Sequence, residues 1–156
     1  MSSELTAIVP LSALLAARSI QAGRVSFKVT EDWQQGRTVF GGLLSALSAQ
    51  AMRDVCGADW PMRALQTNFV GPVGLGTFHV DVSLLRQGKN VRQVKAMVVQ
   101  ADAQGVEQVC GILLGVFGTG RTSEIPSRRP LQPPVAVGAE ASTPLPYLPG
   151  LTPNFT

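Results

Sequence analysis

Two consecutive glycines, Gly41 and Gly42, stand at the start of a long apolar stretch and are the first candidates for chemistry. The stretch predicts a helix, and the first N–H groups of a helix lack partners within it and carry partial positive charge. Glycines there would leave these groups bare and closely approachable, so that they could stabilise a negatively charged oxygen. The alternative is that the pair only permits a tight turn into the helix.

A second candidate is the basic segment Arg86-Gln-Gly88-Lys89, whose composition is typical of a β-hairpin turn. Arginine binds phosphate through its planar fork and lysine acts as a point charge, so basic groups fixed at a hairpin suit phosphate recognition. Arg92 and Lys95 would extend this basic edge along the next strand. A solvated turn without a ligand is the alternative interpretation.

The composition limits the class of protein. The chain has 156 residues, of which 45% are apolar and 15% charged, which suits one globular domain and excludes disorder of the whole chain. The net charge is +3, but the basic residues are scattered, whereas a nucleic-acid interface would gather them in a stripe. No apolar run approaches the ~18 residues that span a bilayer. Cys56 and Cys110 lie in apolar runs typical of reduced thiols. We expect a cytoplasmic protein that binds neither nucleic acid nor a membrane.

The elements that must position these residues follow from hydrophobic periodicity. The pattern predicts a short helix over 12–18, a strand from Gly23, a surface loop over 30–39 and a long helix from Gly41 to about Val55. Four strands are expected over 64–70, 76–87, 91–100 and 106–117. The long helix has almost no polar face and must be covered on nearly all sides. The predicted fold class is α+β, with a curved antiparallel β-sheet wrapped around one long central α-helix.

The distribution of proline predicts how the chain is divided. Eight of the 11 prolines lie between Pro126 and Pro153. Dense proline favours an extended, semi-rigid backbone without a core. We therefore expect an N-terminal helical segment at 1–22, the globular domain at 23–118 and a Pro-rich tail or linker at 119–156.

This layout resembles the hot-dog-fold acyl-CoA thioesterases over roughly 23–118. The resemblance rests on Val39-Phe-Gly-Gly42 at the start of the helix, Leu85-Arg-Gln-Gly-Lys-Asn90 at a hairpin, and Pro72 before the third strand. The chain looks most like the N-terminal half of the double hot-dog thioesterase II group. It is also similar to the single-domain phenylacetate-pathway and 4-hydroxybenzoyl-CoA thioesterases. The resemblance implies the hot-dog fold and a CoA thioester as ligand.

The resemblance also implies roles for individual residues. Gly41 and Gly42 would polarise the thioester carbonyl, because free N–H groups stabilise the oxyanion of the tetrahedral intermediate. Gln34, six residues before Phe40, would orient the thioester, and Gln50 or Asn68 would hold a water. The residues implied at the channel for the nucleotide and pantetheine are Arg86, Gly88 and Lys89.

Few other polar residues are expected near the cleft. Ser45 and Ser48 lie on the helix, and Thr67 precedes Asn68 on the next strand. His79 alternates with apolar neighbours, so we expect it to face away from the core and take no part in catalysis.

The chain departs from the family pattern where an acid should stand. The single-domain enzymes carry Glu or Asp seven residues past the second glycine, where this chain has Ala49. The catalytic positions of the thioesterase II group correspond to Ala64, Leu85 and Leu113, none of which can activate water. Phe40 stands where dehydratases of this fold often have His, which argues against a hydratase or dehydratase.

Two functions stay open at this point. The first is an acyl-CoA thioesterase, a hydrolase whose site is shared across a homodimer or a dimer of dimers and which needs no cofactor or metal besides its CoA thioester substrate. The second is a non-catalytic, acyl-CoA-binding or structural hot-dog half that completes a partner's active site.

Overall fold

The structure is a computed structural model that describes residues 8–57, 60–120, 122, 124–125, 131 and 141. The chain divides into a unit of residues 1–119 and a unit of residues 120–156. Most of the predicted Pro-rich segment 119–156 lies outside the described residues. Within the described part, no helix has the length and apolar character that crossing a membrane requires.

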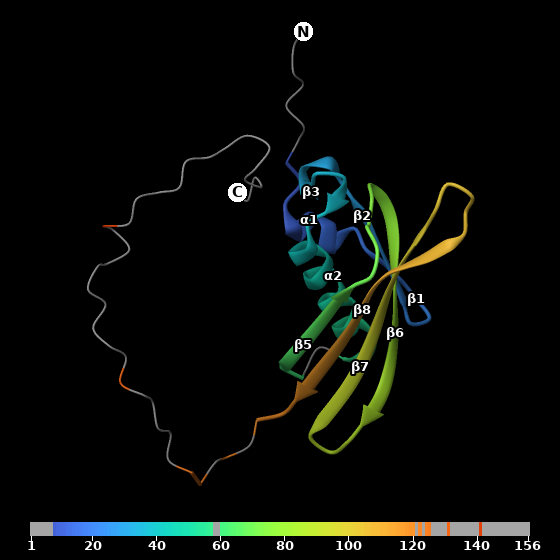
Figure 1. The fold of residues 1–156 in the computed structure, drawn as a ribbon. Helices are drawn as coiled ribbons and strands as arrows, with labels where there is room; N and C mark the ends of the chain where they lie inside the picture. Colours follow the sequence, from blue (N-terminus) through green and yellow to red (C-terminus); the bar gives the residue numbers. More distant parts are fainter. Residues whose placement is uncertain are drawn as a thin grey trace. The chain divides into compact units, whose positions relative to one another are not determined.

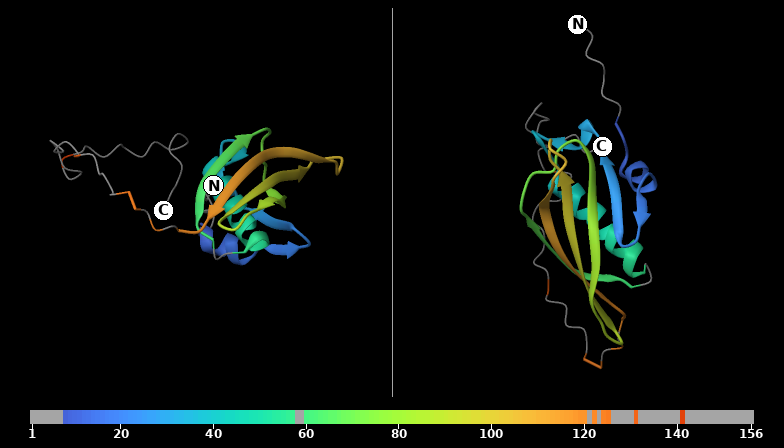
Figure 2. Two further views of the ribbon diagram at one scale, coloured as in Figure 1. Left: turned by 90° about the horizontal axis from the view of Figure 1, so that it is seen from below. Right: turned by 90° about the vertical axis from the view of Figure 1, so that its right-hand side faces the viewer.

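One curved antiparallel sheet and one long helix dominate the first unit (Figure 1, Figure 2). The sheet has six strands in the order β1-β2-β6-β7-β8-β5. Helix α2, Gly41–Cys56, lies against one of its faces. The strands are β1 Ser19–Gln21, β2 Arg24–Val29, β5 Met62–Phe69, β6 Gly76–Gln87, β7 Val91–Ala101 and β8 Glu107–Gly118. The smaller elements are α1 Leu11–Ala16, a 3-10 helix Glu31–Trp33, β3 Gln34–Gln35 and β4 Thr38–Val39. The predicted α+β architecture is confirmed.

The core forms between α2 and the sheet. On the helix, Leu43, Leu47 and Ala51 follow a spacing of four residues, which places them on one face, and all three are buried. Opposite them, β6 and β8 contribute buried Val80 and Leu113 from alternating positions. A large aliphatic side chain buried in this way contributes roughly 1.5–3 kcal/mol to folding. The buried residues of α2 and of the strands therefore determine which face of the sheet packs against the helix.

One face of α2 is not covered by this unit. Gly42 and Ala46 are exposed, while Ala49 and Arg53 on the same stripe are half-buried. The spacing of four, three and four residues puts all four on one side of the helix, away from the buried side. The sequence predicted cover on nearly all sides, and a single unit leaves this stripe open.

The N-terminal part of the chain holds more than the predicted helix. β1 pairs antiparallel with β2, with Gln21 opposite Arg24. Ala22 and Gly23 form the two-residue turn between them and both have positive φ, 43° and 88°. This conformation is typical of tight hairpins, but Ala rarely adopts it. The sequence did not predict strand β1, because the turn after it has Ala22 where glycine or asparagine would be the usual signal.

The segment 30–39, predicted as a surface loop, contains the short hairpin β3–β4 and ends in a buried residue. Val39 is buried and donates its N–H to the carbonyl of Val73 at 2.8 Å. The indole Nε1 of Trp33 donates to the carbonyl of Val9 at 2.7 Å. These contacts attach the segment to the core immediately before α2 begins.

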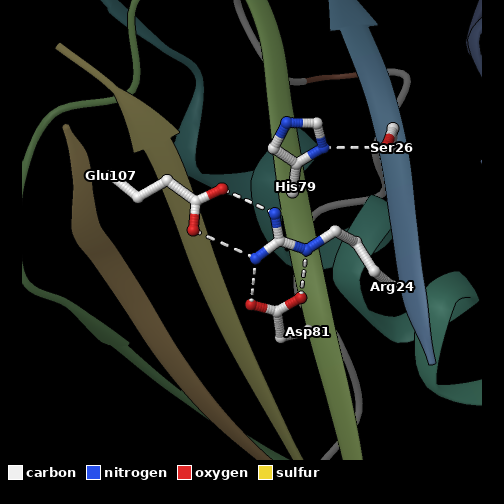
Figure 3. A network of polar contacts seen from close by, with 5 residues as sticks. All are labelled: Arg24, Ser26, His79, Asp81 and Glu107. Atoms are coloured by element: carbon white, nitrogen blue, oxygen red, sulfur yellow. Dashed lines mark hydrogen bonds and ion pairs between the residues drawn. The ribbon is translucent and has the colours of Figure 1, made fainter. Parts of the chain in front are cut away.

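The face of the sheet opposite α2 carries a charged network (Figure 3). The guanidinium of Arg24 on β2 contacts both carboxylate oxygens of Asp81 on β6, at 2.6 and 2.7 Å. It also contacts Glu107 at the start of β8, at 2.5 and 3.1 Å. On the same face, Ser26 and the Nδ1 of His79 are hydrogen-bonded at 2.7 Å. His79 thus faces away from the core, as its alternation predicted.

This network predicts that the stability of the fold depends on pH in the acidic range. The hydrogen bond with Arg24 lowers the pKa of Glu107 below its ordinary value of 4.5. The unfolded chain therefore takes up this proton first as the pH falls, so the contribution of Glu107 is complete above pH 4.5 and is lost below it. Glu107→Gln should flatten the fall in melting temperature between about pH 5 and pH 3. A wild-type acid profile retained by this variant would contradict the assignment.

Ser48 provides a second prediction, on packing. It lies in the middle of α2, fully buried, and its Oγ has no hydrogen-bond partner among the described residues. A buried polar atom without a partner costs about 1–3 kcal/mol. Ser48→Ala should therefore raise the free energy of unfolding by about 1 kcal/mol in chemical denaturation.

Ser45→Ala is the matched control on the same helix. The hydroxyl of Ser45 donates to the carbonyl of Gly41 at 3.0 Å and lies 3.3 Å from the hydroxyl of Thr67. Since this change removes hydrogen bonds that exist, it should lower stability by about 1 kcal/mol. Equal effects of the two substitutions would show that helix propensity alone decides both.

Candidate functional site

Backbone hydrogen bonds of Phe40 fix the start of α2. The N–H of Phe40 donates to the carbonyl of Trp33 at 3.0 Å, and the N–H of Leu44 donates to the carbonyl of Phe40 at 3.1 Å. Phe40 is the N-cap and provides no side-chain hydrogen bond to the helix. The first N–H groups, those of Gly41 and Gly42, therefore have a fixed position and receive no side-chain cap from Phe40. A site for a negatively charged oxygen requires both properties.

The two glycines leave room for aromatic rings. A Cβ on Gly41 would lie 2.8 Å from Cζ of Phe69 on β5, and a Cβ on Gly42 would lie 2.4 Å from Cε1 of Phe40. Both distances are shorter than the contacts that non-bonded carbon atoms make in proteins. The glycines therefore let two rings lie against the helix start, in addition to exposing its backbone.

Gln34 lies at the same end of α2. It is half-buried, and in the β3–β4 hairpin it pairs with Val39, two residues before the helix begins. The backbone thus brings Gln34 beside the helix start, as its position in the sequence suggested. Its use as the amide that orients a thioester stays a prediction.

Two hydroxyl groups meet between α2 and β5. Ser45, one turn after Gly41, lies 3.3 Å from Thr67, oxygen to oxygen. Because side chains alternate along a strand, Thr67 shares its face with Leu65 and Phe69. Leu65 and Phe69 are apolar, so the alternation in the sequence could have predicted that Thr67 lies on the face of β5 toward α2.

Asn68, the predicted water-holding residue on this strand, faces the opposite way. Its Nδ2 donates to the carbonyl of Ile112 at 3.3 Å, and Gln66 donates to its Oδ1 at 3.5 Å. Both amides therefore lie on the outer face of the sheet. The structure does not bring Asn68 to the helix start, because its neighbour Thr67 takes the inner position.

Gln50, the other predicted water-holding residue, is engaged further along α2. Its Nε2 donates to Oδ1 of Asp54 at 2.8 Å. Asp54 in turn accepts two bonds from the guanidinium of Arg18, at 2.6 and 2.9 Å. Gln50 lies eight residues beyond Gly42, about 12 Å along the helix. This polar group ties α2 to the segment after α1 and does not reach the glycines.

The basic hairpin lies at the opposite end of α2. Arg92 donates from Nη1 to the carbonyl of Cys56, the last residue of the helix, and its guanidinium lies 4.3 Å from the ring centroid of Trp60. Arg86 is exposed and pairs with Gln93, next to Arg92. The hairpin thus reaches the helix C-terminus, and Arg92 has a structural role there. The helix has 16 residues, so about 24 Å separates its two ends.

Within the hairpin, Gly88 donates its N–H to the carbonyl of Val91 at 2.8 Å, which closes the turn. Lys89 is exposed at the turn. The predicted phosphate-binding residues Arg86, Gly88 and Lys89 are therefore together, but one unit places them far from Gly41 and Gly42.

The positions to which the resemblance assigns catalytic groups are separated here. Leu113 is buried opposite Thr67, Ala64 is exposed on the outer face, and Leu85 occupies an irregularity in β6 between Leu84 and Arg86. On α2 the carboxylate is that of Asp54, which is paired with Arg18. This unit thus provides a helix start without a side-chain cap from Phe40 and without a carboxylate beside it on α2.

Comparisons with known proteins agree with this geometry. A family described as the acyl-CoA thioesterase N-terminal domain matches residues 29–118, more than half of the chain. No curated protein matches. Three solved structures illustrate the shared fold at about 20% sequence identity.

A hot-dog-fold protein from Alicyclobacillus acidocaldarius is 20% identical, with a TM-score of 0.69 over 85% of this chain and 48% of that one. A thioesterase-like, phenylacetic acid degradation-related protein from Ralstonia eutropha is 20% identical, with a TM-score of 0.60 over 72% and 92%. A protein from Bacillus halodurans, crystallised with CoA, is 20% identical, with a TM-score of 0.52 over 62% and 66%.

The chain spans about half the length of the Alicyclobacillus protein. The match to the family covers the strands and the helix that build the site, and the solved structures share their arrangement. This chain therefore belongs to the acyl-CoA thioesterase family, as an N-terminal-type domain with the hot-dog fold.

Proposed function

We propose that this chain binds a CoA thioester at the start of α2 and takes part in its hydrolysis, in a site shared with a second hot-dog unit. The observation that carries the proposal is the uncapped helix start at Gly41 and Gly42, beside the edge strand β5. Its N–H groups suit the oxygen of a thioester carbonyl, which becomes negatively charged as the carbonyl carbon is attacked.

The chemistry proposed for this site is simple hydrolysis. A water oxygen adds to the carbonyl carbon, the carbon–sulfur bond breaks, and the products are a carboxylic acid and the CoA thiol. Gly41 and Gly42 stabilise the oxyanion and Gln34 orients the thioester. The paired hydroxyls of Ser45 and Thr67 are one turn away and suit a water that approaches the carbonyl. A hydroxyl pair positions water but is a poor base at neutral pH, so hydrolysis in the shared site needs a proton acceptor other than this pair.

The second unit is expected at β5. This strand is at the edge of the sheet, most of its side chains are exposed, and the open stripe of α2 with Gly42 and Ala46 is a further unpaired surface. An unpaired strand edge favours pairing with another strand. Antiparallel pairing of two such edges about a two-fold axis would continue the sheet and set the two helices side by side in opposite directions.

This arrangement would resolve the distance between the two predicted parts of the site. In antiparallel helices, the C-terminal end of one lies beside the N-terminal end of the other. The hairpin of the second unit, with Arg86 and Lys89, would then approach Gly41 and Gly42 of the first. Phosphates of CoA bound by the hairpin and a thioester bound at the helix start would belong to one ligand spanning both units.

A second function is favoured by one observation. The carboxylate of Asp54 on α2 is paired with Arg18, and Ala49 stands where the single-domain enzymes carry an acid. A chain without a proton acceptor beside the helix start could still bind the thioester. The alternative proposal is therefore an acyl-CoA-binding half that completes the active site of another hot-dog unit.

Activity and the role of the helix start can be tested together. Purified chain should release free thiol from decanoyl-CoA or from another acyl chain in a panel of lengths. Gly42→Ala places a Cβ 2.4 Å from the ring of Phe40, which must then move at the oxyanion site. We expect kcat/KM to fall at least tenfold, because a misplaced oxyanion donor costs about 10²–10³ in rate.

Gly120→Ala is the matched glycine control, because a Cβ there meets no atom within 4 Å, and it should leave the rate unchanged. Calorimetry with the same thioesters separates the two proposals. Binding without thiol release supports the acyl-CoA-binding half, and neither binding nor release contradicts both.

The pairing at β5 gives a separate prediction. Leu65→Lys puts a charge on the inner side of the edge strand, where a second unit would have to bury it without a partner. Light scattering should give at least twice 16.5 kDa for the unaltered chain and the mass of a single unit for the variant. Val106→Lys, at an exposed position just before β8, should not change the mass. A monomeric unaltered chain at working concentration would contradict the pairing of two copies.

A further inference from the structure

Phe69 is an aromatic residue left uncovered at the reactive end of the helix. It is the last residue of β5, and its side chain is 60% exposed. Its ring nevertheless has a defined place, because Cζ lies 2.8 Å from the position of a Cβ on Gly41. An exposed aromatic ring against the backbone of an oxyanion site requires an explanation, since burial of the ring elsewhere would stabilise the fold.

The backbone around this ring is fixed. Val70 and Gly71 both donate their N–H groups to the carbonyl of Cys110, at 2.9 and 3.0 Å. Phe69 itself pairs with Gly111 on β8. Glycine is thus the neighbour of the ring on the adjacent strand and also on the helix, so neither Gly111 nor Gly41 has a side chain that could cover it. The exposure of the ring follows from its neighbours and does not require a mobile backbone.

The position of the ring relative to the N–H groups defines what it could contact. A carbonyl oxygen bound at Gly41 and Gly42 places its carbon about one bond further out, and the acyl chain continues from that carbon. Because the ring touches the space next to the Cα of Gly41, the first few carbons of the acyl chain are within its reach. The two rings that lie where a Cβ of Gly41 or Gly42 would stand, those of Phe69 and Phe40, are both apolar.

We propose that Phe69 is the specificity-determining residue of the site and selects apolar acyl groups, alkyl or aromatic, over acyl groups that carry a carboxylate. This inference rests on the proposed function and names the substrate class of the same site. An apolar chain gains contact with the ring and leaves water. A carboxylate in the same place would lose hydration against two aromatic rings without a charged partner from them.

The test compares three CoA thioesters, hexanoyl, benzoyl and succinyl, with the unaltered chain and with Phe69→Ala. The unaltered chain should prefer the first two. The variant should lose about tenfold or more in kcat/KM for hexanoyl- and benzoyl-CoA, and little for succinyl-CoA, because loss of apolar pocket contacts costs about 10–200-fold. Phe69→Leu should restore most of the hexanoyl activity. Val106→Ala, at a site of similar exposure just before β8, is the control and should leave all three rates unchanged.

A binding measurement keeps this inference separate from the proposed hydrolysis. Calorimetry with S-hexyl-CoA, a thioether that cannot be hydrolysed, and with CoA itself should show weaker binding of S-hexyl-CoA by the variant and unchanged binding of CoA. Equal loss for both ligands, equal loss for all three thioesters, or a change of mass in light scattering would show an interface role and overturn the inference. If the unaltered chain binds neither ligand, the proposed function fails as well. Unchanged selectivity in an active variant overturns the role of Phe69 alone.

Discussion

The apolar side chains of a 16-residue helix have to be removed from water, and the rest of this molecule is arranged around that requirement. A flat sheet could cover one side of α2, whereas a twisted and curved one covers more of it. The long strands β6, β7 and β8 provide that curvature, and their alternating apolar residues form, with those of β2, most of the other half of the core. Even so, one stripe of the helix stays open, because the edge strand β5 ends the sheet before the helix is enclosed.

The same packing sets the position of the reactive groups. α2 begins where β4 is attached to the core through Val39 and Val73, so the uncapped N–H groups at Gly41 are held by residues that also complete the fold. The far end of the helix is held by Arg92 through the carbonyl of Cys56. One helix therefore separates the glycine pair at its start from the basic hairpin at its far end by its own length. A ligand with phosphates at one end and a thioester at the other suits two such helices in opposite directions.

The distribution of charge within the unit is consistent with a divided site. Three carboxylates, those of Asp54, Asp81 and Glu107, are paired with arginines and serve the fold. Two of them are on the outer face, away from α2 (Figure 3). Near the helix start, the polar groups on α2 and β5 are the neutral hydroxyls of Ser45 and Thr67. Neutral groups and backbone dipoles can polarise a carbonyl but are poor proton acceptors, and this supports the proposal of a shared site.

The sequence by itself determined the long helix, the five main strands, the glycine pair at the helix start and the basic hairpin, because periodicity and turn residues are local signals. The hot-dog architecture followed from the resemblance of these motifs to a known family. The sequence did not determine which side chains meet. Thr67 and Asn68 are adjacent, and the pairing of β5 with β8 decides that Thr67 reaches Ser45 while Asn68 reaches Ile112. The ion pair of Arg18 with Asp54 and the contact of Phe69 with Gly41 likewise join distant elements. Such contacts depend on strand order and curvature, since a shift of one residue along a strand turns a side chain to the other face.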